Sequence, residues 1–505
     1  MKQHNLIMSI SVALVLVLSA CTKLDEEFNS ELEQSSASAI PVADLLRSAY
    51  NSLNSPFMDQ SRLWAAQEHT TDEVIGPTRG PDWDDNGVWR VLHSHNWNAD
   101  HGFLRDTYRE LLQAQFSASN VLQFNPTAQQ AAEARFLRAL TVFVVADGWD
   151  QVPFRDDLKD LKKLPTTLKG TAAIDFCIKE LNEILASLPD GPTSTANKDG
   201  AKVLLMKCYL NKGTIANRAA PTFPPADMAQ VITLADQLIN SNKYSLANNV
   251  FDNFAPDNDV KSTENIYTIY NKDGDRGGNV RSRWFMGLHY NQKPSGWNGF
   301  TTLSDFYNKF DANDLRRGGS YTGVTNVSGL RVGFLVGQQF NENNVALKDR
   351  RGNDLVFTPE VKLKETGNNL EITGIRVMKY PPDYSGGDQA DNDYVVFRYA
   401  DVLLMKAEAL LRTNNAAAGL TIVNSIRTKR NAPILATLDA NALIDERGRE
   451  LYFEGWRRQD LIRFGKFLTP WQEKPTDDPK YLIFPIPSEQ LAVNPNLEQN
   501  PGYAN

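Results

Sequence analysis

The sequence predicts a mainly α protein built from helix hairpins, with a long loop-rich insertion that contains small β elements. Two observations support this fold class. Apolar residues recur at helical spacing in several long segments, and the pentapeptide VLLMK occurs in two of them, at 203–207 and 402–406. Between these two segments, clusters of Gly, Asp and Asn separate short runs of β-forming residues.

The N-terminus has the features of a lipoprotein export signal. An uncharged apolar stretch runs from Ile7 to Ala20, which is shorter than the about 20 residues that a membrane-spanning helix needs. The sequence LSAC at 18–21 resembles a bacterial lipobox, so we expect residues 1–20 to be a signal peptide and Cys21 to be lipidated. A plain secretory signal and a chance cysteine are the alternatives.

The polar, Ser-rich residues 21–40 are expected to form a flexible tether that carries the lipidated Cys21. The acidic residues soon after Cys21 resemble a signal for the outer membrane, with the protein facing the cell exterior. We therefore expect membrane contact through the N-terminal lipid only.

The first helical region is expected over 41–245. Pro41 stands where a helix would begin, a second helical pattern covers 132–149, and a third covers 201–213 with Gly213 as its predicted end. Small and large residues alternate along these segments in a pattern that resembles tetratricopeptide helices, although no strict repeat length is kept. An irregular tract at 71–100 interrupts the helices and is the predicted ligand loop.

The C-terminal region, 246–505, begins with the insertion at about 246–395. Its β-like runs include ENIYTIY at 264–270 and TGIRVMKY at 373–380. A last helix hairpin is expected at about 398–430. Rigid helices that carry long loops are typical of a binding protein.

Composition excludes some functions. The chain has 505 residues, of which 41% are hydrophobic and 23% charged, as in ordinary globular proteins. The chain has 53 basic and 61 acidic residues, which gives a net charge of −8, and it contains no basic run that would suggest nucleic-acid binding. Cys177 and Cys208 lie in apolar helical contexts, where we expect buried thiols, with one disulfide as the alternative.

Several segments occur in an order that is specific to one family. They are EARFLRALTVFVVADGWDQVPF, GAKVLLMKCYLNKG, FRYADVLLMKAEAL, IVNSIRTKRNAP, IDERGRELYFEGWRRQDLIRFGKF and the terminal IFPIPSEQLAVNPNLEQNPGY. In these segments, and over nearly its whole length, the chain resembles the SusD/RagB family of Bacteroidetes outer-membrane lipoproteins.

This resemblance implies a function. Members are cell-surface glycan-binding proteins that act as the lid of a SusC-like TonB-dependent transporter, to which they deliver oligosaccharides. Some relatives bind peptides, so a RagB-like peptide or glycopeptide receptor is the alternative. A surface glycosidase and a structural repeat lipoprotein without a ligand are further alternatives. The sequence contains no G-x-S-x-G, P-loop or dinucleotide-binding motif, so we expect no enzymatic activity and no cofactor.

Sugar binding requires aromatic faces and planar polar side chains. Candidates come from the loop at 71–100 and from the insertion, and they are Trp83, Trp89, Trp97, Trp284, Tyr290, Trp297, Asn96 and Asn298. The alternative for each ring is that it fills a gap in the core beneath a loop. The family has no universal glycan-contact motif, so these residues are predicted from their chemistry alone.

Other polar clusters favour structural roles. Glu446, Glu450 and Glu454 share one helix face by their spacing, but interleaved arginines predict ion pairs and not a glycosidase carboxylate pair. His93, His95 and His101 lie close together in the sequence, but neither a cysteine nor another ligand stands at a familiar metal-binding spacing from them. No metal site is therefore expected. The aspartates at 383, 388, 391 and 393 miss the EF-hand spacing, which makes turn capping the prediction and a structural calcium ion unsupported.

Overall fold

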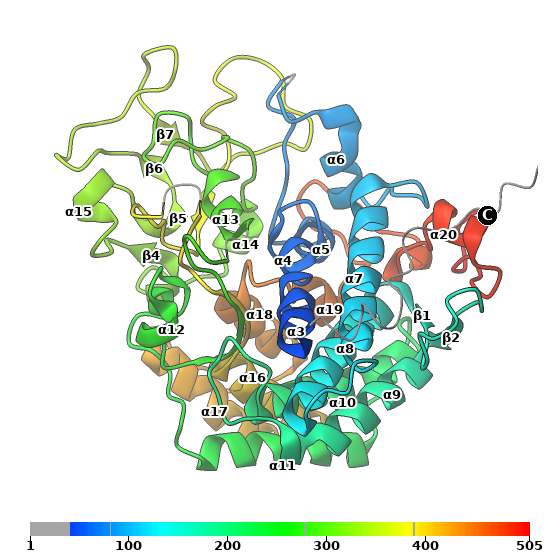
Figure 1. Cartoon of the computed structure of the whole chain (residues 1–505). Coiled ribbons are helices and arrows are strands. Elements are labelled where there is room, and N and C mark those ends of the chain that lie inside the picture. The colour runs from blue at the N-terminus through cyan, green and yellow to red at the C-terminus, as the bar shows by residue number, and fades with distance from the viewer. Residues whose placement is uncertain (1–40, 81, 277–278, 387–388, 505) are drawn as a thin grey trace, which may run out of the picture. The chain divides into compact units, whose positions relative to one another are not determined.

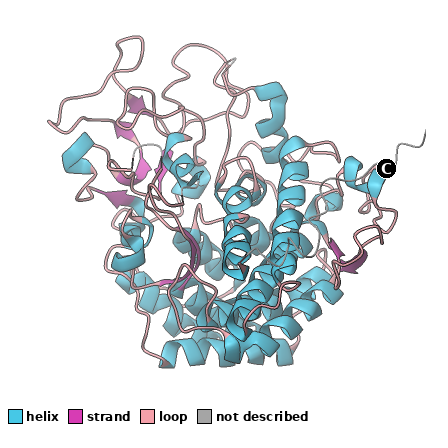
Figure 2. Ribbon diagram, viewed as in Figure 1, coloured by secondary structure: helices cyan, strands magenta, loops and turns pink. Residues whose placement is uncertain are grey.

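The computed structural model describes residues 41–504 except 81, 277–278 and 387–388. The predicted signal peptide, Cys21 and the tether lie outside these residues. Helices dominate the described part of the chain and strands are few and short, which confirms the predicted mainly α fold class (Figure 2). No helix among the described residues is long and apolar enough to cross a membrane.

The helices fall into a long N-terminal series, several short turns within the insertion, and a C-terminal group. Their bounds are α3 Val42–Asn51, α4 Asn54–Met58, α5 Leu63–Glu68, α6 Val88–His93, α7 Gly102–Val121, α8 Ala128–Trp149, α9 Thr171–Ile184, α10 Lys198–Ala216, α11 Pro225–Asn240, α12 Asn258–Lys261, α13 Ser282–Phe285, α14 Ser304–Tyr307, α15 Thr325–Ser328, α16 Tyr399–Arg412, α17 Ala416–Lys429, α18 Ala440–Leu451, α19 Arg457–Arg463 and α20 Ser488–Val493.

Successive long helices pack side by side. Helices α7 to α11 each contact the next in sequence, α11 contacts α16, and α16 contacts α17, so the chain leaves the stack after Asn240 and returns to it at Tyr399 (Figure 1). Helix α8 begins with a capping box, in which Thr127 accepts from the Gln130 backbone and the Gln130 side chain accepts from the Thr127 backbone. This stack is the scaffold that carries the loops.

The end of α10 differs from the sequence prediction. The sequence predicts that this helix ends at Gly213, yet α10 continues to Ala216. A Cβ atom at Gly213 would lie 2.0 Å from the backbone oxygen of Thr222, so the glycine allows the following segment to cross the helix closely. Close packing, and not helix termination, therefore explains the glycine.

Within the described residues, the strands form four small antiparallel sheets. Their bounds are β1 Gln151–Phe154, β2 Thr166–Lys169, β3 Asn265–Ile269, β4 Gly318–Gly319, β5 Val332–Leu335, β6 Gly337–Gln338, β7 Val356–Phe357, β8 Arg376–Met378 and β9 Tyr394–Arg398. The pairing of β3 with β9 joins the beginning and the end of the insertion and leads directly into α16. Both β-like runs of the sequence, at 264–270 and 373–380, contain observed strands.

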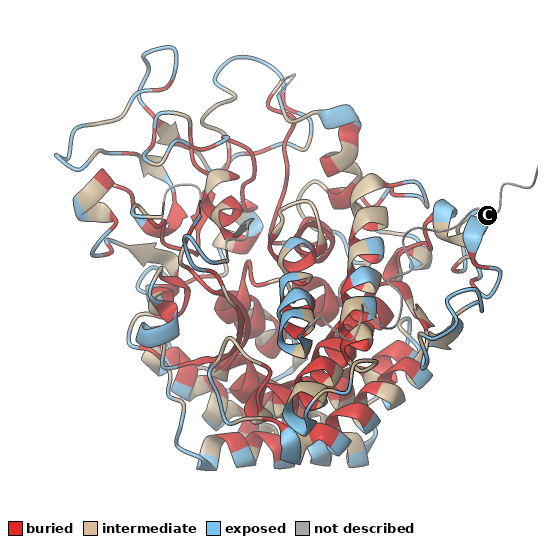
Figure 3. Cartoon of the chain, viewed as in Figure 1, coloured by how far each residue is buried: buried red, intermediate tan, exposed pale blue. Residues whose placement is uncertain are grey.

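The hydrophobic core lies among the helices, and exposed residues gather on the long loops (Figure 3). Helix α8 is buried along nearly all of its length from Ala132 to Trp149. Cys177 and Cys208 are both fully buried free thiols, as expected, and the Cys177 Sγ donates to the Ala139 carbonyl. The open alternative of a disulfide is therefore not adopted.

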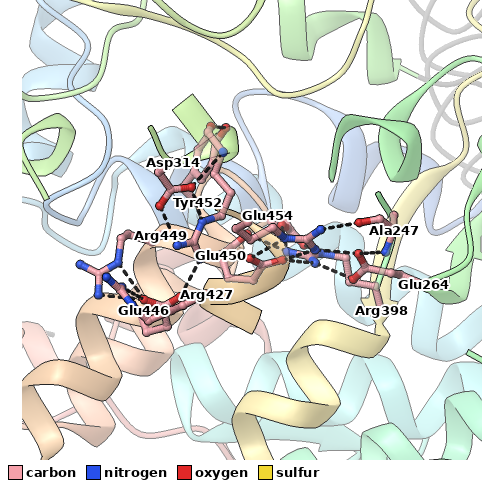
Figure 4. A network of polar contacts seen from close by, with 12 residues as sticks. Ala247, Glu264, Asp314, Arg398, Arg427, Glu446, Arg449, Glu450, Tyr452 and Glu454 are labelled. Atoms are coloured by element: carbon pink, nitrogen blue, oxygen red, sulfur yellow. Dashed lines mark hydrogen bonds and ion pairs between the residues drawn. The ribbon is translucent and has the colours of Figure 1, made fainter. Parts of the chain in front are cut away.

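A network of ion pairs crosses the interior near α18 (Figure 4). Glu450 is fully buried and accepts from Arg316, Arg398 and Arg430 at 2.8 to 3.1 Å. Burial alone would raise the pKa of Glu450, but these arginines outweigh it and hold the pKa well below its usual value. The predicted ion pairing of the glutamates is thus confirmed.

The predicted partners and helix length were partly wrong. Helix α18 ends at Leu451, so Glu454 follows the helix and pairs with Arg398 and Lys379. Of the interleaved arginines, only Arg449 pairs with one of the three glutamates, Glu446. The remaining partners come from distant segments, because buried charges pair with whatever the tertiary fold places beside them.

Candidate functional site

A pocket of about 500 Å³ opens among the loops that the helix stack carries. Four segments line it, at 78–84, 290–298, 349–351 and 364–371, and the two later segments belong to the long loops at the top of Figure 1. This volume lies within the range of about 300–1,000 Å³ that is typical of small-molecule sites. The lining consists mainly of charged side chains, together with two asparagines and the aromatic ring of Tyr290.

One wall of the pocket is built around Glu371. Its carboxylate accepts from Arg350 Nε at 2.6 Å and from the buried His289 Nε2 at 2.8 Å. Because the Asn291 backbone N–H donates to His289 Nδ1, the ring is the neutral tautomer with its proton on Nε2. Burial lowers the pKa of His289 despite the nearby carboxylate, in agreement with this neutral form.

Arg350 also covers an aromatic ring. Its guanidinium carbon lies 4.0 Å from the centroid of the half-buried Tyr290 ring. About half of the Arg350 side chain remains exposed, and its second carboxylate neighbour, Asp82, is 3.9 Å away. Arg350 and Tyr290 therefore present a planar polar group and an aromatic surface side by side.

The floor of the pocket is a buried hydrogen-bond network. Arg79 donates to the backbone oxygens of Asn298 at 2.9 Å and Leu370 at 2.7 Å, and Arg376 donates to the Asn298 side chain at 2.8 Å. Burial lowers the pKa of Arg79 to about 10, and burial together with the charge of Arg79 lowers the pKa of Arg376 well below its usual value. These contacts fix the floor before any ligand arrives.

The loop backbone at the pocket is strained. Trp83 and Asn298 adopt positive φ angles of 61° and 54°, a region that costs non-glycine residues of order 1–3 kcal/mol each. The Trp83 indole donates to the Trp297 backbone oxygen at 2.9 Å. A Cβ atom at Gly299 would lie 2.5 Å from the Trp83 ring, so this glycine makes room for the indole.

The structure brings only part of the predicted binding set to this pocket. Tyr290 and Asn298 line it, and Trp297 precedes Asn298 with 39% of its surface exposed while its ring stacks on Phe285. Trp83 is half-buried and packs against Phe300. These residues remain together as a candidate group.

Three predicted rings lie inside the protein. Trp89, Trp97 and Trp284 are 3%, 3% and 1% exposed. The Trp89 indole donates to Asp85 and the Trp97 indole to the Tyr503 hydroxyl, both at 2.8 Å. These rings have no free face for a ligand and correspond to the alternative of core filling beneath a loop.

Asn96 lies outside the pocket. Its side chain is exposed and its amide donates to the Ser94 backbone oxygen at 3.1 Å. This contact closes a local turn, and no pocket-lining residue is among its hydrogen-bond partners.

The three histidines that were considered for a metal site are buried hydrogen-bond partners. His93 contacts the Val74 and Gln472 backbone oxygens, His95 contacts Asp477 and the Thr70 backbone oxygen, and His101 contacts the Val88 backbone oxygen. Among the described residues, no group of three or more His, Cys, Asp or Glu side chains could hold a metal ion.

The aspartates considered for calcium have ordinary structural contacts. Asp383 caps the turn at Ser385 and Gly386, Asp391 pairs with Lys272, and Asp393 accepts from Thr268 at 2.8 Å. Asp388 lies outside the described residues.

Sequence reasoning missed the segments at 349–351 and 364–371. The first of these segments lies in a charged, turn-rich run, KDRRGND at 348–354, but such a run is also typical of a solvated loop. Their role depends on Tyr290 and Glu371 lying beside Arg350, and no local pattern encodes these long-range contacts.

Comparisons with known proteins agree with this architecture. The starch-binding protein SusD of Bacteroides thetaiotaomicron is 27% identical over 416 residues, covering 75% of this chain and 73% of that protein. Among solved structures, a SusD superfamily protein from Parabacteroides distasonis matches with a TM-score of 0.72 and 19% identity, covering 92% of this chain and 98% of that chain. A laminarin-binding SusD-like protein matches with a TM-score of 0.69 and 19% identity, covering 92% and 99%.

These structural matches, at their low identity, establish the fold. The sequence profile of the SusD family matches residues 234–503, which is more than half of the chain. The protein therefore belongs to the SusD family.

Proposed function

We propose that this protein is a cell-surface glycan-binding lipoprotein that captures oligosaccharides in the pocket around Arg350 and Tyr290. The observation that carries the proposal is this pocket, where an aromatic ring, amides and charged groups surround a space of about 500 Å³. Pyranose rings offer C–H faces to aromatics and hydroxyls to planar polar groups. The similarity to a starch-binding and a laminarin-binding protein supports the same ligand class.

The proposed contacts come from two kinds of side chain. Tyr290 and the exposed Trp297 would supply aromatic surface, whereas Asn298 and Arg350 would supply hydrogen bonds. Arg79, Arg376 and Glu371 position these groups through the contacts described above. The preformed floor lowers the entropy cost of binding, because few side chains must be ordered when the ligand enters.

Binding without turnover is the expected chemistry. Glu446 and Glu450 are fully buried and form ion pairs with arginines. Of the five pocket carboxylates, Glu365, Glu371 and Asp84 each bind a neighbouring arginine. Asp82 lies 3.9 Å from Arg350, and Asp349 accepts from the Arg351 and Asn353 backbone N–H groups. A glycosidase needs two carboxyl groups free to face the scissile bond. The captured oligosaccharide would pass to a SusC-like TonB-dependent transporter, with this protein acting as the lid and held at the membrane by lipid on Cys21.

Calorimetry on the purified full chain tests the proposal with maltohexaose and laminarihexaose as probes. We expect saturable binding of at least one probe and no cleavage products by chromatography. Release of shorter saccharides would show an enzyme instead. Absence of binding to a wider panel of neutral and acidic glycans, together with binding to peptides, would favour the peptide-receptor alternative.

A further inference from the structure

A second cavity, of about 380 Å³, lies beside β4 and β5 and has a different charge character from the first. Its lining includes Arg317 and Arg331, and none of the described residues that line it is acidic. The remaining lining residues are apolar, aromatic, amide or glycine. The first pocket, by contrast, contains five acidic side chains.

Neither arginine forms an ion pair within the part of the chain that the structure describes. The Arg317 guanidinium lies over the Tyr307 ring, 4.4 Å from its centroid, and donates to the Tyr307 hydroxyl. Arg331 is exposed, and its guanidinium lies beside Gly319. Among the described residues no carboxylate forms an ion pair with either arginine, so both positive charges remain available.

The backbone gives this cavity a fixed shape. Gly318 and Gly333 pair across β4 and β5, and a Cβ atom at Gly318 would lie 1.9 Å from the Val332 backbone oxygen. Gly329, with φ of 75°, would place a Cβ atom 2.2 Å from the Asn341 carbonyl carbon. Arg317 and Arg331 stand at the two ends of this close pairing, so the strands hold them at the same cavity.

Apolar surface accompanies the charge. Phe340 and Val336 line the cavity and are 39% and 38% exposed. An aromatic or aliphatic surface beside a guanidinium suits a ligand that combines C–H groups with an oxyanion. The planar guanidinium can donate two parallel hydrogen bonds to a carboxylate or a sulfate.

We propose that this cavity is a second saccharide subsite that binds a sugar unit bearing a carboxylate or a sulfate ester. Arg331 and Arg317 recognise the oxyanion and Phe340 covers the ring of the same unit. The subsite goes beyond the proposed function, because it is a separate cavity and binds by charge. It would let the protein select acidic glycans that also engage the first pocket.

Calorimetry with matched ligands tests the subsite. The probes are hexagalacturonate, its fully methyl-esterified neutral form, and a sulfated galactose hexasaccharide. We expect hexagalacturonate or the sulfated probe to bind about tenfold or more tightly than the neutral ester, as charge-assisted hydrogen bonds predict. The preference should shrink when NaCl rises from about 50 mM to about 500 mM. The preferred acidic probe identifies the oxyanion.

Variants locate the binding. Arg331→Gln should remove most of the acidic preference without loss of folding, because this exposed side chain has no protein partner among the described residues. Arg317→Gln should act in the same direction, and Arg109→Gln, at an exposed helix position, should change nothing. Equal affinity for acidic and neutral probes would overturn the subsite. So would an acidic preference that survives in both variants or that Arg350→Gln alone removes. Either result leaves neutral-glycan binding at the first pocket intact.

Discussion

Arg398 donates two parallel hydrogen bonds to Glu454, from Nε to Oε2 and from Nη2 to Oε1, both at 2.8 Å. This pair joins the last residue of β9 to the segment that follows α18, and both side chains are buried. Arg398 also donates to Glu264 and Glu450 at 2.9 Å, so one guanidinium connects three separate parts of the chain (Figure 4). The beginning and the end of the loop-rich insertion are thereby fixed to the helices.

Glu450→Gln should destabilise the protein strongly. The variant keeps the side-chain shape but leaves Arg316, Arg398 and Arg430 with one negative charge fewer in a buried environment. Breaking a buried ion pair costs about 3–5 kcal/mol, and we expect a loss of this size in the free energy of unfolding. Guanidinium denaturation followed by circular dichroism measures it. Glu342→Gln, at an exposed position, should change the free energy by less than about 0.5 kcal/mol, and a similarly small change for Glu450→Gln would contradict this role.

Arg350→Ala and Tyr290→Ala should each weaken oligosaccharide binding by about tenfold. The ligand for this test is the hexasaccharide probe that the wild-type protein binds. The Arg350 guanidinium and the Tyr290 ring lie against each other in the pocket, so each variant removes one of two adjoining surfaces that would contact the ligand. Tyr290→Phe should retain most of the affinity if the ring face is the main contact. Calorimetry gives the affinities, with Asn240→Ala on an exposed helix end as the control. Wild-type affinity in both alanine variants would place the ligand elsewhere.

Glu68 and Glu73 should make stability fall as pH rises from about 5 to about 8. Both side chains are buried, and burial raises the pKa of Glu73 to about 7 and that of Glu68 well above its usual value. The folded pair therefore holds protons that the unfolded chain releases above about pH 4.3. Its contribution to stability is complete below that pH and is lost as pH passes through the folded pKa.

Glu68→Gln should remove much of this dependence. Glutamine can still accept from the Gly455 N–H, which lies 2.6 Å from Glu68 Oε1, and it needs no proton to donate toward Glu73. We compare the free energy of unfolding of the variant with that of wild type at each pH. The difference should favour the variant by about 1 kcal/mol more at about pH 8 than at about pH 5. Urea denaturation across this range measures the difference. If the free energy of unfolding of the two proteins changed with pH in parallel, the protons on Glu68 and Glu73 would not be the cause of the pH dependence.

Cys177 and Cys208 should not react with an aromatic disulfide reagent in the native state. Both thiols are 0% exposed, and burial raises the pKa of Cys177 well above its usual value, which suppresses the reactive thiolate. In denaturant without reductant both should react at once, as mass spectrometry can count. A requirement for reductant before they react would reveal a disulfide between them.

Cys21→Ser should abolish incorporation of labelled palmitate and release the protein from the membrane fraction. The expectation follows from the lipobox at 18–21, since a serine cannot carry the thioether-linked lipid. Cys208→Ala should keep the label. Protease treatment of intact cells then tests exposure at the surface, and protection of the wild-type protein would exclude an outward orientation.

The fold could be predicted from sequence to a large extent, because helical periodicity is local. The segment at 132–149 lies within α8, the second VLLMK copy at 402–406 lies within α16, and each of the two β-like runs contains an observed strand. Errors arose where a local cue had a tertiary cause, as at Gly213. For the candidate site, Tyr290 and Asn298 were predicted and line the pocket, whereas Arg350 and Glu371 were missed. The aromatic candidates differ in whether the ring is exposed or buried in the core. The sequence does not predict this difference, because burial depends on which distant segments fold over each ring.

The repeated pentapeptide shows what each level determines. The sequence alone places VLLMK twice on apolar helices. One copy lies in α10 and the other in α16, as periodicity predicts. Only the tertiary structure gives their lysines different roles. The Lys207 side chain is 1% exposed, pairs with Asp401 at 2.8 Å and lies 3.5 Å from the centroid of a Trp456 ring. The Lys406 side chain is 19% exposed and pairs with Asp236 near the surface. Helix formation depends on neighbours in sequence, whereas the environment of a charge depends on what packs against it.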